Sequence, residues 1–165
     1  MKVYNTESIR NIAFIGHGGS GKTSLSEVLL FTAGETNRIG RVEEGNTISD
    51  YNANEIERQI SMSVTPLHLE WNDTKINILD TPGYFDFSGQ VKSALKVVDT
   101  SVSFVKSFEG IEVGTESTWE FVKEAGIPSA FIINKCDNEH SKFFDTFKSI
   151  KERLSVNAVI VSFPV

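Results

Sequence analysis

The stretch Gly16-His17-Gly18-Gly19-Ser20-Gly21-Lys22-Thr23 decides the fold, because it fits the GxxxxGK(S/T) pattern of a phosphate-binding loop. The apolar residues 9–15 before it predict a buried strand, and residues 24–31 after it predict a helix with an apolar stripe. In such a strand–turn–helix unit, backbone N–H groups and the positive end of the helix dipole face an anion. The loop and Ser24 are therefore predicted to bind the phosphates of a nucleoside triphosphate, with a plain glycine-rich turn as the alternative.

A second segment, Asp80-Thr81-Pro82-Gly83, lies between this loop and the later motifs and predicts a metal and γ-phosphate contact. Lys22 is expected to reach the β- and γ-phosphates, and the Thr23 hydroxyl to hold Mg²⁺. A carboxylate at the end of a strand that faces the loop can hold Mg²⁺ through water, which is the role predicted for Asp80. The N–H of Gly83 can meet a γ-phosphate and sense whether it is present. The alternative is an ordinary Pro-Gly surface turn.

The segment Asn134-Lys135-Cys136-Asp137 predicts which nucleotide is bound. It follows the apolar residues 129–133, which are typical of a central parallel strand. Guanine offers two adjacent donors to the Asp137 carboxylate, whereas adenine would leave that carboxylate unpaired. Asn134 is expected to steady the loop and to approach the purine edge, and the Lys135 stem to cover one face of the base. The nucleotide is therefore predicted to be GTP; an ATP-using P-loop kinase is the alternative, which a preference for ATP would favour.

The composition indicates one globular domain. The chain has 165 residues, 39% of them hydrophobic and 23% charged, and its single cysteine, Cys136, excludes an internal disulfide. Residues 1–7 lack the apolar core of a signal peptide, and no run is long enough to span a bilayer. The net charge of −6 disfavours nonspecific binding to nucleic acid, while a specific RNA contact stays open. We therefore expect a cytoplasmic, monomeric domain with no membrane or DNA partner.

The order of expected elements predicts an α/β fold of the P-loop NTPase type, a three-layer α/β/α sandwich. Its sheet is expected to be mostly parallel with one antiparallel hairpin strand, turning at Asn72-Asp73. The polar residues 35–61 predict a long functional loop. After the first strand and helix, the expected strands are residues 63–71, 75–80, 100–108, 129–133 and 158–161, and the expected helices are residues 85–99, 114–125 and 140–154.

With these segments placed, the chain resembles the GTP-binding domain of translational GTPases, most closely that of elongation factor G. The resemblance runs from Arg10 to about Pro164 and includes residues 10–12, 57–61, 80–87 and 109–112. In that family the long loop is switch I and the Asp-Thr-Pro-Gly segment opens switch II. The resemblance implies GTP and GDP as ligands, Mg²⁺ as metal, and hydrolysis driven by the ribosome during translocation or recycling. Large-subunit RNA and proteins would be the partners, reached through a longer parent protein.

Three residues depart from the family pattern. Tyr84 stands where the family has the histidine that positions the attacking water, and a phenol with a pKa near 10 cannot supply an imidazole's charge. Gly19 replaces an aspartate of the phosphate loop, and Ser61 replaces the switch I threonine that binds Mg²⁺. Together the first two changes favour GTP binding with slow hydrolysis. A GTP-gated ribosome-binding factor for rescue or protection, with slow or no hydrolysis, is the competing interpretation.

The resemblance also bounds the domain and completes the predicted site. The fifth guanine motif of the family has no match after Asp137, so residues 1–165 are expected to form an incomplete GTP-binding domain, the amino-terminal part of a longer protein. Tyr84, Gly83 and Lys22 are the predicted catalytic residues, and Thr23, Ser61 and Asp80 the predicted metal ligands. The predicted nucleotide-binding residues are Gly16, His17 (through its backbone rather than its ring), Gly18, Gly19, Ser20, Gly21, Lys22, Thr23, Ser24, Asp80, Gly83, Asn134, Lys135 and Asp137.

Overall fold

A sheet of five strands, in the order β2-β3-β1-β4-β5, forms the middle layer of the computed structural model, which describes residues 2–155 and 157–164. The strands are β1 (Ile9–Gly16), β2 (Thr65–Trp71), β3 (Thr74–Asp80), β4 (Thr100–Lys106) and β5 (Ser129–Asn134). β1 pairs in parallel with β3 and β4, and β4 pairs in parallel with β5. Because parallel strands end at the same edge, the carboxyl ends of β1, β3, β4 and β5 lie together, where ligands bind in folds of this kind.

Only β2 runs against its neighbour, and a two-residue turn explains how. Trp71 of β2 faces Thr74 of β3, so Asn72 and Asp73 form the whole connection. Both have positive φ, at 46° and 57°, the backbone conformation of a type I′ hairpin turn whose twist matches that of the flanking strands. The predicted hairpin is confirmed.

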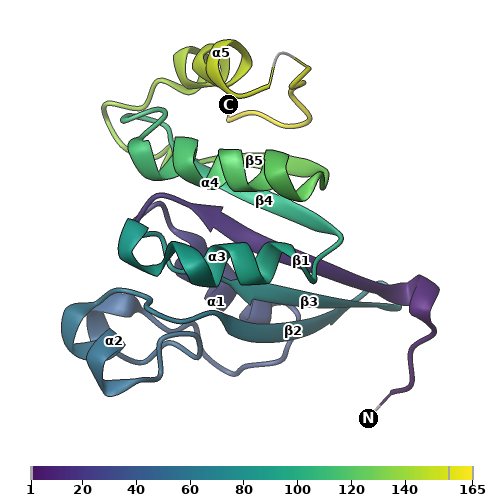
Figure 1. The fold of residues 1–165 in the computed structure, drawn as a ribbon. Helices are drawn as coiled ribbons and strands as arrows, with labels where there is room; N and C mark the ends of the chain where they lie inside the picture. The colour runs from purple at the N-terminus through teal and green to yellow at the C-terminus, as the bar shows by residue number, and fades with distance from the viewer. Residues whose placement is uncertain (1, 156, 165) are drawn as a thin grey trace.

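Helices cover both faces of the sheet. On one face lies α1 (Lys22–Thr32), and on the other lie α3 (Ser88–Leu95) and α4 (Val113–Ala125) side by side, as Figure 1 shows. Helix α5 (Phe143–Arg153) packs beside β5, and the short α2 (Ala53–Arg58) stands apart from the sheet. The structure is the predicted three-layer α/β/α sandwich.

Alternating residues of β1 build the two halves of the core, as expected for a central strand covered on both faces. Ala13 and Ile15 pack with α3 and α4, whereas Phe14 packs with α1, β2 and β4. The Phe14 and Phe104 rings lie 5.0 Å apart between centroids, and Phe104 is fully buried. This pair packs across β1 and β4, the hydrogen-bonded strands that lead to the phosphate loop and to α4.

Three predicted segments differ from the structure. The single helix predicted for residues 85–99 is a short 3-10 helix (Phe85–Phe87) followed by α3, and it ends at Leu95. The loop predicted for residues 35–61 contains α2, stabilised by a capping box between Asn52 and Glu55.

The strand predicted at residues 158–161 is wrong. These residues are irregular, with Val159 79% and Val161 95% exposed, because none of the five strands in the described part of the chain pairs with this short apolar run. None of the helices in residues 2–155 and 157–164 combines the length and the apolar character that crossing a bilayer requires.

Replacing the Phe104 ring should test the core. Phe104→Ala removes a fully buried side chain and leaves a cavity beside Phe14, so we expect the free energy of unfolding to fall by about 3–5 kcal/mol. Phe85→Ala removes the same ring from a site that is 72% exposed and should change it by less than about 0.5 kcal/mol. Urea unfolding followed by circular dichroism measures both, and equal losses would contradict this account of the core.

Candidate nucleotide site

The phosphate loop turns sharply between β1 and α1, as the sequence predicts. Gly16, Gly19 and Gly21 have φ of 131°, 69° and 96°, which side chains rarely adopt and glycine adopts readily. Gly21 is the residue before the first turn of α1, so the N-terminal N–H groups of that helix open directly onto the loop. The backbone is therefore arranged as an anion-binding turn.

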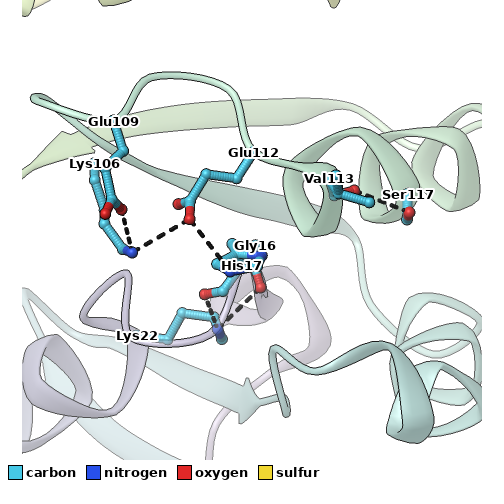
Figure 2. Close-up of polar contacts among 8 residues, drawn as sticks. All are labelled: Gly16, His17, Lys22, Lys106, Glu109, Glu112, Val113 and Ser117. Atoms are coloured by element: carbon cyan, nitrogen blue, oxygen red, sulfur yellow. Dashed lines mark hydrogen bonds and ion pairs between the residues drawn. The ribbon is translucent and has the colours of Figure 1, made fainter.

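Lys22, the first residue of α1, is the buried cation of this loop. The residue is only 5% exposed, and its Nζ donates hydrogen bonds of 3.0 Å to the carbonyls of Gly16 and His17, as Figure 2 shows. Burial lowers the pKa of the ammonium to about 8, while the negative charges of Asp80, Asp50 and Glu112 oppose that shift. An anion that entered the loop would add to this stabilisation of the charged form.

Hydroxyl and carboxylate oxygens gather next to Lys22. Thr23 Oγ1 lies 3.2 Å from Ser61 Oγ, which brings the start of α1 to the end of the long loop. Asp80, at the end of β3, is 1% exposed; its Oδ2 accepts a 2.7 Å hydrogen bond from Ser49, and its Oδ1 has no partner among the described residues. Burial raises the pKa of this carboxyl. The hydroxyls of Ser49 and Thr23 lie near this carboxylate, and that of Ser61 lies beside Thr23. Oxygen atoms of this kind are ligands that fit Mg²⁺.

The turn after β3 lies directly against the phosphate loop. A Cβ atom on Gly83 would come within 2.6 Å of both the Gly18 nitrogen and Lys22 Nζ, so only glycine fits there. The ring of Tyr84 lies over Gly18, where a Cβ atom would stand 2.9 Å from two of its carbons. Tyr84 is 44% exposed. Both residues are thus at the phosphate loop, as predicted.

The segment that follows β5 reaches the other side of the loop. Asn134 Nδ2 donates a 2.9 Å hydrogen bond to the carbonyl of Ser20, and Ser107 Oγ donates one of 2.7 Å to the carbonyl of Lys135. Asp137 follows two residues later with its side chain exposed. Asn134 therefore ties the segment after β5 to the phosphate loop.

One cavity of about 220 Å³ brings most of these residues together. It is lined by residues of the phosphate loop, of the long loop, of the turn after β3, and by Lys135. Three predicted residues are not part of the lining: Asn134, Asp137 and Asp80. Asn134 and Asp137 lie on either side of Lys135 in the sequence, and Asp80 accepts a hydrogen bond from Ser49, the neighbour of Asp50.

Two groups of residues at the site were missed by the sequence analysis. Asp50 lines the cavity at 4% exposure, and burial raises its pKa to about 6. Its neighbour Ser49 contacts Asp80. Both lie in the long loop, and nothing in the spacing of that polar segment marks them out from its other polar residues.

The second group corrects the prediction that His17 acts through its backbone alone. His17 Nε2 lies 3.2 Å from Glu112 Oε1, the residue before α4, and Lys106 Nζ lies 3.3 Å from the same oxygen. Lys106 also pairs with Glu109, and Figure 2 shows the chain of contacts from Lys106 through Glu112 to His17. The ring thus ties the phosphate loop to the segment between β4 and α4.

The glycine-rich turn, its buried lysine and the carboxylate at the end of β3 define a P-loop nucleotide-binding domain of the doubly wound α/β class. Comparison with known proteins narrows the class: the family described as elongation factor Tu GTP binding domain matches residues 7–163, and the chain belongs to that family. The predicted family resemblance is confirmed.

Relatives agree with this membership. The chain is 39% identical to the mitochondrial ribosome-releasing factor 2 of Debaryomyces hansenii over 155 residues, which are 94% of this chain and 18% of that protein. It is 37% identical to elongation factor G of Gluconobacter oxydans over 157 residues, 95% of this chain and 22% of that protein.

A crystal structure of a protein from Thermus thermophilus is also similar, with 33% identity and a TM-score of 0.87 over 90% of this chain and 22% of that one. The chain therefore spans about a fifth of the length of the relatives it matches.

Neutralising Asp50 should stabilise the nucleotide-free protein at high pH. Its pKa is raised in the folded state, so the destabilisation it causes is complete above about pH 6 and disappears as the pH falls toward 4. In EDTA at pH 8, we expect the free energy of unfolding of Asp50→Asn to exceed that of the parent chain by about 1–3 kcal/mol. Near pH 4 the two free energies of unfolding should be equal.

Urea unfolding at several pH values measures the difference, with exposed Asp86→Asn as the control. A variant that is no more stable than the parent at pH 8 would show that the closed loop tolerates this charge without cost.

Proposed function

We propose that this chain binds GTP and GDP together with Mg²⁺ and hydrolyses GTP, as the GTP-binding domain of an elongation factor G-like translation factor. The observation that carries the proposal is the convergence of Lys22, Thr23, Ser61 and Gly83 on one cavity in a domain of this family. The named relatives, an elongation factor G and a ribosome-releasing factor, support the ribosome as the partner of the longer protein.

The phosphate loop and Lys22 would hold the phosphates. Lys22 Nζ now donates to two loop carbonyls, and it can turn toward β- and γ-phosphate oxygens that offer full negative charge in place of a carbonyl dipole. The N–H of Gly83 stands within reach of the same place because its Cα closely approaches the loop. These contacts favour a γ-phosphate position between the phosphate loop and the turn after β3.

Thr23 and Ser61 would bind Mg²⁺ through their hydroxyls, and Asp80 would hold the metal's water ligands. A Mg²⁺ ion held by these residues would supply positive charge that offsets the negative charge developing on the phosphates during transfer. The chain's own contribution is to bring Ser61 to Thr23 and to keep the Asp80 carboxyl buried at the end of β3. Asp50, which faces the same cavity, adds a second acidic group that favours a cation there.

The segment after β5 would select guanine. The exposed Asp137 carboxylate can accept from both donors on the guanine edge, and the Lys135 stem can cover the ring. The hydrogen bond from Asn134 to Ser20 keeps this segment at a fixed distance from the phosphate loop. A fixed distance lets one nucleotide span both.

Tyr84 would act on the attacking water only weakly. Its ring lies on Gly18 beside the proposed γ-phosphate position, so the hydroxyl can contact a water there, but a phenol is neutral at physiological pH. The same observation favours a second candidate: a GTP-gated ribosome-binding factor in which hydrolysis is slow or absent. The two candidates share the nucleotide site and differ in turnover.

Titration with fluorescent GTP, GDP and ATP analogues, with and without Mg²⁺, tests the binding part of the proposal. We expect GTP and GDP to bind more tightly than ATP, and Mg²⁺ to strengthen GTP binding. Asp137→Ala removes two charge-assisted hydrogen bonds and should weaken GTP and GDP roughly a hundredfold, with little change for ATP. The exposed Glu139→Ala, two residues on, is the matched control. A preference for ATP in the parent chain would overturn the guanine assignment.

Single-turnover GTP hydrolysis with and without ribosomes separates the two candidates. In the longest natural protein that contains this chain, we expect Tyr84→His to raise the ribosome-stimulated rate at least tenfold, because an imidazole can take up a proton near neutral pH and a phenol cannot. Tyr84→Phe removes only the hydroxyl and shows what that group contributes. An unchanged or lower rate in the histidine variant would mean that tyrosine is a working replacement.

A further inference from the structure

Helix α1 carries a buried carboxylate that the proposed chemistry does not use. Glu27 is 1% exposed, and it lies on the same helix as Lys22 and Thr23. Its Oε1 accepts a 2.7 Å hydrogen bond from the Ile48 N–H, and its Oε2 accepts one of 3.1 Å from the Gly40 N–H. A buried carboxylate is tolerated only where such donors replace water. Both donors here come from the long loop, residues 35–61, which we call the switch loop.

The backbone of the switch loop is shaped to fit this carboxylate. A Cβ atom on Gly40 would stand 2.5 Å from Glu27 Oε2 and 2.8 Å from both the Asn46 carbonyl oxygen and the Thr47 Cα. Those distances are shorter than van der Waals contact allows, so a larger residue at position 40 would push the loop off the helix. Glycine at position 40 and glutamate at position 27 therefore serve the same close approach.

The segment that Glu27 binds at Ile48 leads directly into the nucleotide site. Ser49, the next residue, donates to Asp80 Oδ2 at 2.7 Å, and its carbonyl accepts a 2.9 Å hydrogen bond from Thr65. Asp50 follows and lines the cavity. Only Ser49 lies between Ile48, which contacts Glu27, and Asp50 in the cavity wall, so a shift of Ile48 is expected to displace Ser49 and Asp50.

We propose that Glu27 is a positioning residue of the nucleotide site: its carboxylate holds Gly40 and Ile48 on α1 and thereby places Ser49 and Asp50 against Asp80. Glu27 is not part of the cavity lining, and it acts through the switch loop. The effect on nucleotide binding rests on the proposed function. The contact of Glu27 with Gly40 and Ile48, which we call the latch, is a property of the chain and does not depend on that function. Glu27 and Lys22 share helix α1, so the switch loop and the phosphate loop are anchored on the same element.

Glu27→Gln is the sharpest change, because it keeps the shape of the side chain and turns one acceptor oxygen into an NH₂ donor. That NH₂ would face either the Gly40 or the Ile48 N–H, leaving a buried donor without a partner. Arg38 and Arg41 flank Gly40 and are exposed, so trypsin can report on the opening of this segment. We expect cleavage at these two arginines to accelerate at least tenfold in Glu27→Gln, while cleavage after exposed Lys92 and Lys123 on α3 and α4 stays unchanged.

Two further variants serve as an independent test and as a control. Gly40→Ala opens the same contact from the loop side and should give the same cleavage pattern, which keeps the test open if the glutamine variant folds poorly. Glu35→Gln makes the same chemical change at an exposed position just beyond the end of α1 and should cleave like the parent. Unchanged cleavage in both Glu27→Gln and Gly40→Ala, or acceleration that is equal at all four basic residues, would overturn the latch.

Dissociation of fluorescent GDP in Mg²⁺ tests the consequence for the site. We expect Glu27→Gln to release the nucleotide at least fivefold faster than the parent, and Glu35→Gln to release it at the parental rate. A parent that binds no guanine nucleotide would refute the proposed function, while the trypsin result would still decide the latch. Faster cleavage with an unchanged release rate would overturn the positioning role of Glu27.

Discussion

Stabilising the charge of an almost fully buried lysine ammonium is the constraint on which the site depends. Lys22 is only 5% exposed, and the carbonyls of Gly16 and His17 accept hydrogen bonds from its Nζ in place of bulk water. Those carbonyls point inward only because the loop turns at glycines with positive φ. The carboxylates of Asp80 and Asp50, brought in by β3 and by the switch loop, supply the compensating charge. The turn of the phosphate loop and the placement of these two carboxylates thus both stabilise one buried cation.

The same carboxylates are unfavourable to each other. Asp50 and Asp80 are both almost fully buried, and the charge of Asp80 helps to raise the pKa of Asp50. The closed switch loop is held in place against this repulsion by contacts outside the cavity, namely the amide hydrogen bonds to Glu27 and to Glu55. A divalent cation bound near the Asp50 and Asp80 carboxylates would offset their negative charges and so reduce this repulsion. Loop closure and cation binding therefore favour one another on electrostatic grounds.

The local parts of the fold and site were predictable from the sequence, because neighbouring residues determine them. The phosphate loop, the hairpin turn at Asn72-Asp73 and the position of Asp80 each follow from a short pattern of glycines, turn residues or a strand end. The roles of Glu27 and Glu112 were not predicted. The partners of Glu27, Gly40 and Ile48, lie 13 and 21 residues away in the sequence. The partner of Glu112, His17, lies at a different strand end of the sheet. The strand predicted at residues 158–161 failed for the same reason, since its apolar residues require a partner strand that the sequence pattern cannot reveal.

The packing of the Tyr84 ring on Gly18 couples the size of one residue to the orientation of the other. A Cβ atom at position 18 would stand 2.9 Å from two carbons of the ring, so a larger residue there requires the ring to move. Because Tyr84 is 44% exposed, its ring has space on the solvent side to do so. The absence of a side chain at position 18 therefore determines where the ring of residue 84 rests, and the choice of rotamer at one position is set by a neighbour 66 residues earlier in the chain.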